Sequence, residues 1–124
     1  MPSRTACLVH DLEQFGEAAA PAPVVAPALA TLPEAYGAAY VVEGSTLGGL
    51  VLAERFEAAL GAGTPTSFLR LRGAGTAARW RAFLGELERA EPSLAADDQR
   101  RACDVAVETF ATFSDAFDAL ESHA

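Results

Sequence analysis

The sequence predicts an all-α protein, and three observations carry this prediction. Apolar residues recur at steps of three and four in the long segments of the chain. Prolines and glycines mark the breaks between those segments, and one segment carries three glycines in its middle. The hydrophobic share of 51% is typical of packed helices rather than of a disordered chain. We expect residues 1–124 to form a single domain of about four helices.

The first helix is expected to begin near Ser3, which is a good cap, and to end at Gly16. Residues 17–33 then form a Pro/Ala-rich connection, because its prolines exclude a continuous helix and favour extended backbone. We expect three apolar side chains to hold this connection against the core: Val24, Val25 and Leu29.

The second helix is the most informative segment of the chain. Pro33 and Glu34 suit its first turn, and Gly61 follows Leu60 as a stop. Its middle holds three glycines, which together cost roughly 3 kcal/mol relative to alanine. These are Gly44, Gly48 and Gly49. A kink, or a close approach by another backbone or a flat ligand, is the usual reason for such a cost.

Five residues of this helix share one face that is nearly bare of side chains: Gly37, Val41, Gly44, Gly48 and Leu52. Spacing alone favours helix–helix packing through small residues over a ligand-binding surface. The residues that surround these glycines favour the ligand surface instead, through a resemblance to a known family.

The chain from residue 61 onward is predicted to form a loop and two helices. Phe68, Leu69 and Leu71 are expected to turn the loop at 61–75 inward. Thr76 is a suitable cap for a helix that runs to about Ala90. Its expected apolar stripe is Trp80, Phe83, Leu84 and Leu87.

The last helix follows Pro92, with Ser93 expected as its cap and Asp97 and Asp98 in its first turn. Its apolar seam has the clearest periodicity in the chain, and it runs through Cys103, Ala106, Phe110, Phe113, Phe117 and Leu120. We expect core packing along this seam, and a homodimer interface is the alternative.

Composition and short motifs exclude several classes of function. A net charge of −8 argues against binding to nucleic acid or to an anionic membrane. Cys7 and Cys103 have no partners at metal-binding spacing, and we expect inert thiols in a reducing compartment. The uncharged run at 18–33 contains prolines and cannot span a membrane, and no signal peptide is visible. A cytoplasmic protein is therefore expected. The sequence also lacks a phosphate-binding loop and a nucleophile elbow.

Several motifs occur in the order found in bacterial heme oxygenases. EGSTLGG at 43–49, preceded by Tyr40, resembles the distal helix of that family. DLEQFG at 11–16, ARWRAFL at 78–84 and the final Phe-rich helix are similar to further family segments. The resemblance covers nearly the whole chain and implies a heme-oxygenase-like helical bundle.

This resemblance implies oxidative cleavage of haem, as substrate and cofactor, to biliverdin, CO and ferrous iron, using oxygen and an external electron donor. It implies distal-face roles in catalysis for Gly44, Ser45 and Gly48, although Ser45 equally suits a hydrogen bond to its own helix backbone. The residues expected to contact haem are Gly44, Gly48, Gly49, Tyr40, Arg79 and Arg81. Arg70 and Arg72 are further candidates for binding the haem propionates.

The chain departs from the family at its N-terminus, where the helix that carries the proximal histidine is absent. His10 is expected to face solvent, and His123 stands next to the C-terminus, so neither is expected to bind iron. The sequence therefore does not decide whether the chain is an enzyme. The alternative is a non-catalytic helical module that binds a tetrapyrrole or associates with itself.

Overall fold

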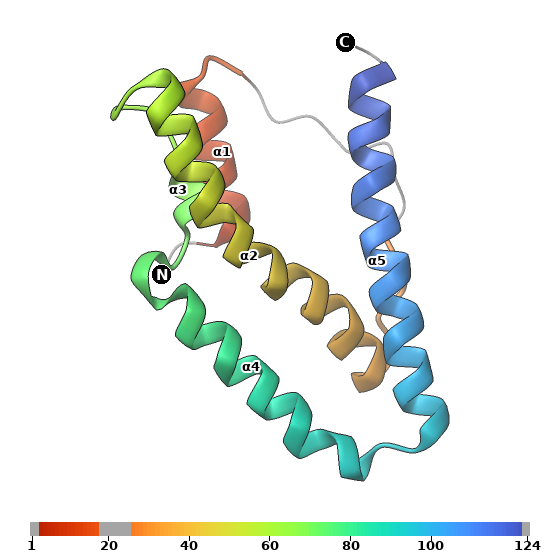
Figure 1. Ribbon diagram of the computed structural model, residues 1–124. Coiled ribbons are helices and arrows are strands. Elements are labelled where there is room, and N and C mark those ends of the chain that lie inside the picture. The colour runs from red at the N-terminus through yellow and green to blue at the C-terminus, as the bar shows by residue number, and fades with distance from the viewer. Residues whose placement is uncertain (1–2, 18–25, 123–124) are drawn as a thin grey trace. The chain divides into compact units, whose positions relative to one another are not determined.

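The computed structural model describes residues 3–17 and 26–122, without the side chains of residues 120 and 122 (Figure 1). Helices dominate this described part, which contains no β-strand, so the all-α prediction is confirmed. The elements are α1 (Arg4–Gln14), α2 (Leu32–Leu60), α3 (Ser67–Arg70), η1 (Gly73–Gly75), α4 (Thr76–Ala90), η2 (Glu91–Ser93) and α5 (Ala96–Ser122). Val24, Val25 and His123 lie outside the described residues.

Internal contacts divide the chain into two compact units. Unit 1 comprises Met1–Ala20 and Ser45–Arg81, and unit 2 comprises Pro21–Gly44 and Ala82–Ala124. Both α2 and α4 therefore contribute one part to each unit. The single domain expected from chain length stays a prediction.

Local signals set most helix ends where the sequence places them. Ser3 caps α1, and its hydroxyl accepts a hydrogen bond from the Ala6 amide at 3.1 Å. Gly16 and Gly61 follow α1 and α2 with φ angles of +79° and +108°, a backbone region that favours glycine. The prediction for Ser93 was wrong, because this residue lies in η2 and α5 begins at Ala96. Asp97 and Asp98 do occupy the first turn of α5.

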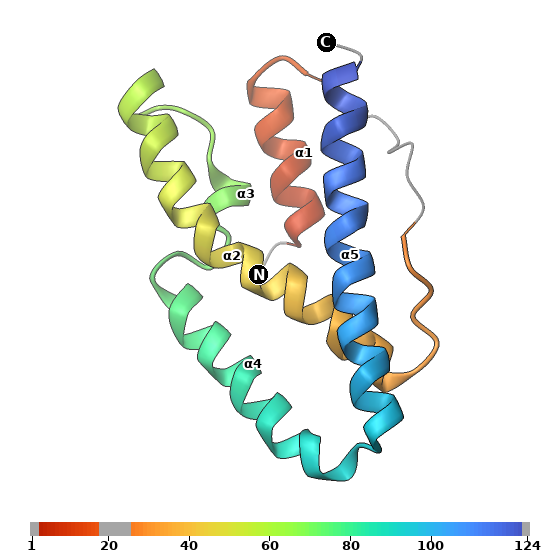
Figure 2. The same ribbon diagram turned by 45° about the vertical axis from the view of Figure 1, so that its right-hand side comes forward.

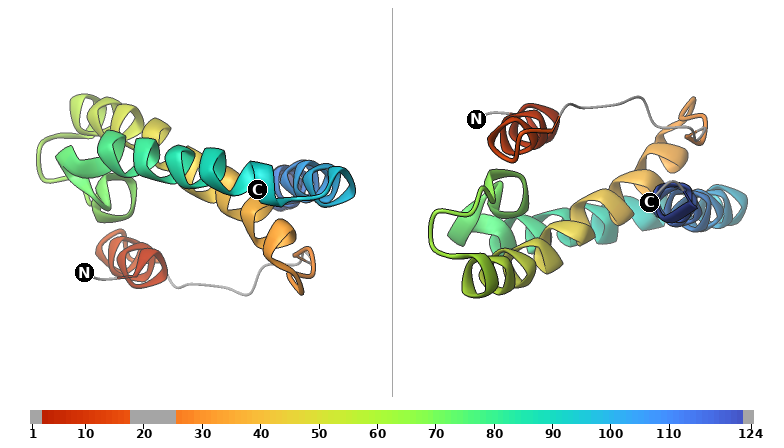
Figure 3. Two further views of the ribbon diagram at one scale, coloured as in Figure 1. Left: turned by 90° about the horizontal axis from the view of Figure 1, so that it is seen from below. Right: turned by 90° about the horizontal axis from the view of Figure 1, so that it is seen from above.

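Unit 1 is fastened by the carboxylate of Asp11, which caps α3 from a different helix. Its Oδ1 accepts hydrogen bonds from the Ser67 amide at 3.1 Å and the Ser67 hydroxyl at 2.6 Å. Its Oδ2 accepts the Phe68 amide at 2.8 Å. Burial raises the pKa of Asp11, but the hydrogen bonds from Phe68 and Ser67 outweigh burial and lower that pKa overall. Figures 2 and 3 show α3 between α1 and the C-terminal part of α2.

Glu57 fastens the other side of α3 to α2. The Arg70 guanidinium donates to both carboxylate oxygens, at 3.1 Å from Nε and 2.9 Å from Nη2. The Thr66 hydroxyl adds a hydrogen bond of 3.0 Å. These bonds, first from Arg70 and then from Thr66, lower the pKa of Glu57. Arg70 is thus occupied by an intramolecular ion pair rather than offered to a propionate.

Unit 2 is held by a close crossing of α2 and α5, which Figure 2 shows where the orange start of α2 passes α5. A Cβ atom added at Gly37 would clash with the Ala102 carbonyl oxygen and would lie 3.0 Å from the Val105 Cβ. Val105 is fully buried on the α5 side of this crossing. Glycine at position 37 therefore serves helix–helix packing, the interpretation that its spacing favours.

A capping box at the start of α2 strengthens the same crossing. The Thr31 amide and hydroxyl donate to Glu34 Oε1 at 3.0 and 2.9 Å, and the Glu34 amide donates back to the Thr31 hydroxyl at 3.4 Å. Glu34 Oε2 accepts Nε and Nη2 of Arg101 on α5, at 3.1 and 2.8 Å. Hydrogen bonds from Arg101, and then from Thr31, hold the pKa of Glu34 below its ordinary value.

Two predictions about the core were wrong. Leu29 is 53% exposed and does not pin the connection to a core. The Phe seam of α5 is not buried either, since Phe110 and Phe117 are 66% and 64% exposed. The buried stripe of α5 instead runs through Val105 and Thr109, about 100° away around the helix. Residues of the α4 stripe and of the 61–75 loop, by contrast, are half-buried.

Candidate functional site

The candidate site is the outward side of α2 in unit 1, which we name the Gly48 face. It consists of Gly48, Val51, Leu52, Arg55 and Phe56, which project within about 80° of the Gly48 direction. A Cβ added at Gly48 meets nothing within 4 Å. Val51, Leu52 and Phe56 are 51%, 45% and 46% exposed. The sequence therefore creates an apolar strip with bare backbone at one end and a cation within it.

The other glycines of α2 behave differently. A Cβ added at Gly49 would lie 2.5 Å from the Leu69 carbonyl oxygen, so Gly49 admits the α3 backbone instead of a ligand. Gly44 is half-buried and belongs to unit 2. Of the three glycines expected at a haem face, Gly48 is thus the one shown to border open space.

Ser45 lies one turn before Gly48 and is exposed. Its hydroxyl accepts hydrogen bonds from both terminal nitrogens of Arg4, at 3.3 Å each. The Arg4 guanidinium also sits 5.1 Å from the centre of the Phe68 ring, within the range of a cation–π interaction. A positive charge from α1 is therefore fixed beside Ser45, at the edge of the Gly48 face.

The remaining predicted contact residues are spread over the chain. Tyr40 is 48% exposed and belongs to unit 2. Arg79 and Arg81 are exposed on the first part of α4, in unit 1. Two residues apart on a helix, they point about 200° away from each other, so they cannot both serve one side of a ligand. Arg72 is half-buried.

Arg55 is a candidate that the sequence analysis missed. It is exposed, lies within about 20° of the Gly48 direction, and makes no ion pair with any of the described residues. Its spacing of seven residues from Gly48 is visible in the sequence. The family motif and the clustered arginines point to other cations, and only the periodicity of the helix face indicates Arg55.

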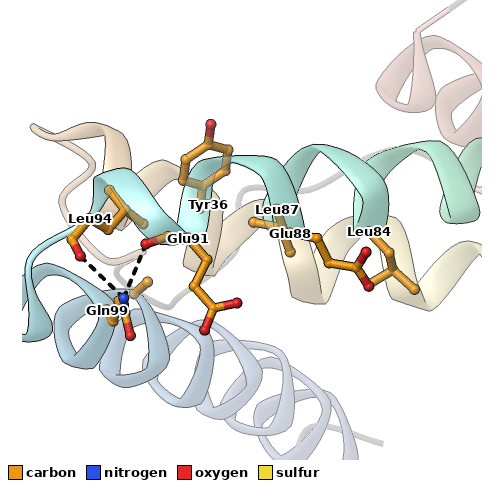
Figure 4. Close-up of a pocket in the computed structure, with 8 residues that line it drawn as sticks. Tyr36, Leu84, Leu87, Glu88, Glu91, Leu94 and Gln99 are labelled. Atoms are coloured by element: carbon orange, nitrogen blue, oxygen red, sulfur yellow. Dashed lines mark hydrogen bonds between the residues drawn. The ribbon is translucent and has the colours of Figure 1, made fainter.

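The structure also contains a cavity of about 250 Å³ in unit 2. Figure 4 shows its lining, in which the Gln99 side-chain nitrogen donates to the carbonyl oxygens of Glu91 and Leu94 at 3.2 and 3.1 Å. Glu88 and Glu91 also line this cavity. A volume below the usual range of about 300–1,000 Å³ and a pair of carboxylates make it a poor place for an anionic macrocycle.

The described residues contain no group of three or more His, Cys, Asp or Glu side chains that could hold a metal ion. His10 is exposed, as expected. Cys7 is buried and Cys103 is exposed, and both are free thiols. None of the helices in the described ranges has the length and apolar character needed to cross a membrane.

No known protein family, curated protein or solved structure matches this chain. The likeness to heme oxygenases thus rests on the sequence motifs, and the geometry of the Gly48 face stands beside them as a separate observation.

Proposed function

We propose that this chain binds haem against the Gly48 face and acts on it as a heme oxygenase. The observation that carries the proposal is the open backbone at Gly48, within a row of exposed apolar side chains. A planar ring can approach bare backbone to van der Waals distance, whereas a side chain at this position would hold it away. The motif EGSTLGG, which contains this glycine, supplies the second line of support.

The Gly48 face matches the apolar ring and the carboxylates of haem, and it contains no side chain that could bind the iron. Val51, Leu52 and Phe56 offer apolar surface that is roughly half exposed, and covering it with a macrocycle would remove that surface from water. Arg55 offers a guanidinium that can grip a propionate carboxylate in two places. The Arg4–Ser45 pair places a second cation at the edge of the face.

In this proposal the chain acts mainly by positioning. The bare turn at Gly48 admits the ring, the apolar side chains exclude water from one side of it, and Ser45 holds a polar group beside it. Bound haem would supply the iron that takes up oxygen and the macrocycle that is opened, with electrons from an external donor.

A second candidate is a protein that holds haem without cleaving it. The exposure of Val51 and Leu52 favours this alternative, because oxygen chemistry needs a site closed to water. The two candidates share the binding face and differ in whether the bound haem is cleaved.

Titration of the purified chain with haemin, followed through the Soret band, tests binding. We expect saturable uptake that is lost in Gly48→Leu, because the new side chain occupies the space above the bare turn. Gly48→Leu should still fold, with a free energy of unfolding within about 1 kcal/mol of the original, since its Cβ meets nothing. Ala58→Leu is a matched control, because it adds the same side chain at an exposed position about 15 Å further along α2.

Two further variants test whether Arg55 binds a propionate and whether His10 contacts the iron. Arg55→Ala should weaken haemin uptake severalfold, and His10→Ala should leave the Soret band unchanged. Adding a reductant and oxygen then separates the candidates, because an oxygenase forms green biliverdin and a binder does not. Equal uptake of haemin by Gly48→Leu and the original chain would show that the Gly48 face is not the site.

A further inference from the structure

Among the described residues of unit 2, the most exposed large apolar side chains lie on α5. We name their surface the Phe face and define it by Ala106, Val107, Phe110, Phe113 and Phe117. Val107, Phe110, Phe113 and Phe117 are 71%, 66%, 44% and 64% exposed. Such large side chains at adjacent helical positions form a patch of the kind that marks an interaction site. Among the described helices of unit 2, none runs beside the C-terminal part of α5 in Figures 1 and 2.

The contacts that α5 makes within unit 2 use a different side of the helix. Arg101 binds Glu34, and Ala102 and Val105 meet Gly37, all on the buried stripe. The Phe face is rotated by about 100° from this stripe. The crossing with α2 therefore reaches the Phe face only at the backbone nitrogen of Ala106, and it leaves the side chains of Val107, Phe110, Phe113 and Phe117 exposed.

We infer that the Phe face binds the same face of a second copy of this chain, with the two α5 helices antiparallel. This goes beyond the proposed function, because it requires no haem. The seam advances in steps of three and four, the spacing that lets two helices pack along their length. Two further properties of the face select the second copy and its direction.

The first property is the distribution of side-chain size. Ala106 stands four residues before Phe110, and Phe117 stands four residues after Phe113. A two-fold axis between Phe110 and Phe113 therefore places each Ala106 opposite a Phe117 and each Phe110 opposite a Phe113. Every such layer then combines residues whose volumes complement each other or stack as aromatic rings. A parallel pair would set Ala106 against Ala106 and leave a void.

The second property is charge. Arg100 and Glu121 are both exposed and lie three heptads apart, on the Val107 edge of the Phe face. The antiparallel arrangement brings Arg100 of each copy beside Glu121 of the other, which gives two Arg–Glu pairs in the dimer. A parallel arrangement would instead place Glu121 beside the acidic end of the second helix. Charge complementarity thus favours the same direction as side-chain size.

Sedimentation velocity over a series of concentrations, without haem, tests the association. We expect a dimer that Phe110→Ser weakens at least about tenfold, because the central layers lose an aromatic ring from each copy. Leu60→Ser is the matched control, since Leu60 is also 66% exposed but lies outside the Phe face. A chain that stays monomeric at every concentration, or a dimer that Phe110→Ser leaves intact, would overturn the inference.

A charge exchange tests the direction. Arg100→Glu and Glu121→Arg should each weaken the dimer about tenfold, because each replaces two attractive pairs with repulsive ones. The double variant should restore the association, since it exchanges the charges within each pair. A dimer that is indifferent to both single reversals would exclude the antiparallel arrangement.

Oxidation of Cys103 gives an independent readout. In the antiparallel dimer the two Cys103 residues lie about 26 Å apart along the helices, too far for a disulfide. In a parallel dimer they would face each other. We therefore expect no disulfide-linked dimer from the original chain, and its formation under mild oxidation would overturn the antiparallel assignment. If Phe110→Ser instead destabilises a monomer, the face is covered within its own chain and the inference fails.

Discussion

Each unit contains one part of α2, and different contacts hold the neighbouring helices to the two parts. In unit 1, two carboxylates hold α3: Asp11 accepts three hydrogen bonds from Ser67 and Phe68, and Glu57 binds Arg70. In unit 2, bare backbone at Gly37 lets α5 approach α2, and one ion pair between Glu34 and Arg101 secures the crossing. Unit 1 therefore uses two carboxylates to hold a short helix, whereas unit 2 joins two long helices through a glycine crossing and an ion pair.

The comparison also separates glycines that look alike in the sequence. Gly37 and Gly49 each meet a neighbouring backbone, at Ala102 and at Leu69, so both serve packing. Gly48, next to Gly49, meets nothing. Helical spacing alone cannot distinguish these cases, because the use of a bare position depends on what stands across from it.

The largest effect should come from filling the crossing in unit 2. Gly37→Leu should lower the free energy of unfolding by about 3 kcal/mol, because its Cβ would clash with the Ala102 carbonyl oxygen and push α5 away. Urea denaturation followed by circular dichroism measures this. Gly48→Leu, the same change on the open side of α2, is the control, and an equal loss in both variants would contradict the packing role of Gly37.

A smaller effect should come from the polar fastening of unit 1. Asp11→Asn should cost about 2 kcal/mol, because one amide cannot accept the bonds from Ser67 and Phe68 that two carboxylate oxygens accept. Trp80 is the only tryptophan and lies in unit 1, so its fluorescence in urea reports on this unit. A loss below about 0.5 kcal/mol would mean that Asp11 is not the main link to α3.

The same carboxylate predicts a pH dependence. Its pKa is lowered in the folded state, from an ordinary value of 3.8. Its contribution is therefore fully present above pH 3.8 and is lost as the pH falls through the lower folded value. The difference in stability between the original chain and Asp11→Asn should stay constant near neutral pH and shrink in acid. If the stability difference between the two proteins grew below pH 3.8, it would contradict a lowered pKa of Asp11 in the folded state.

Much of the fold could be predicted from local signals. Ser3, Gly16 and Gly61 set helix ends through caps and backbone conformation, which depend on neighbouring residues alone. The prediction for Ser93 failed because a good capping residue can also lie in a 3₁₀ turn, and such a turn precedes α5. The prediction for Leu29 failed because hydrophobicity alone does not imply burial, and a single exposed leucine is common.

The tertiary contacts were harder to predict from the sequence. The Phe seam of α5 has the stronger apolar period, yet Val105 and Thr109 face inward, because α2 presents Gly37 and Glu34 to that side. For the candidate site, the motif located Gly48, but its open surroundings could be known only from the positions of its neighbours. Arg55 follows from the helix face and could have been found from spacing.

The capping box of α2 should have a moderate effect. Thr31→Ala should lower the free energy of unfolding by about 1 kcal/mol, because it removes the hydroxyl that bonds Glu34 in both directions. Thermal unfolding by circular dichroism measures the change. The pattern of threonine followed by glutamate three residues later is present in the sequence. An unchanged melting temperature would show that Arg101 and the backbone amides of Ala30 and Thr31 hold Glu34 in place without the hydroxyl.

The smallest expected effect has the opposite sign. Gly48→Ala should stabilise the chain by about 0.5–1 kcal/mol, because alanine is the better helix former and its Cβ meets nothing. Gly49→Ala should instead destabilise it, since the new Cβ would lie 2.5 Å from the Leu69 carbonyl oxygen. Urea denaturation of both variants measures whether two adjacent glycines respond to one substitution in opposite directions. If alanine at position 48 stabilises the chain, glycine there lowers helix stability, as we expect for a residue kept bare for binding. If alanine destabilises the chain, the position is already packed.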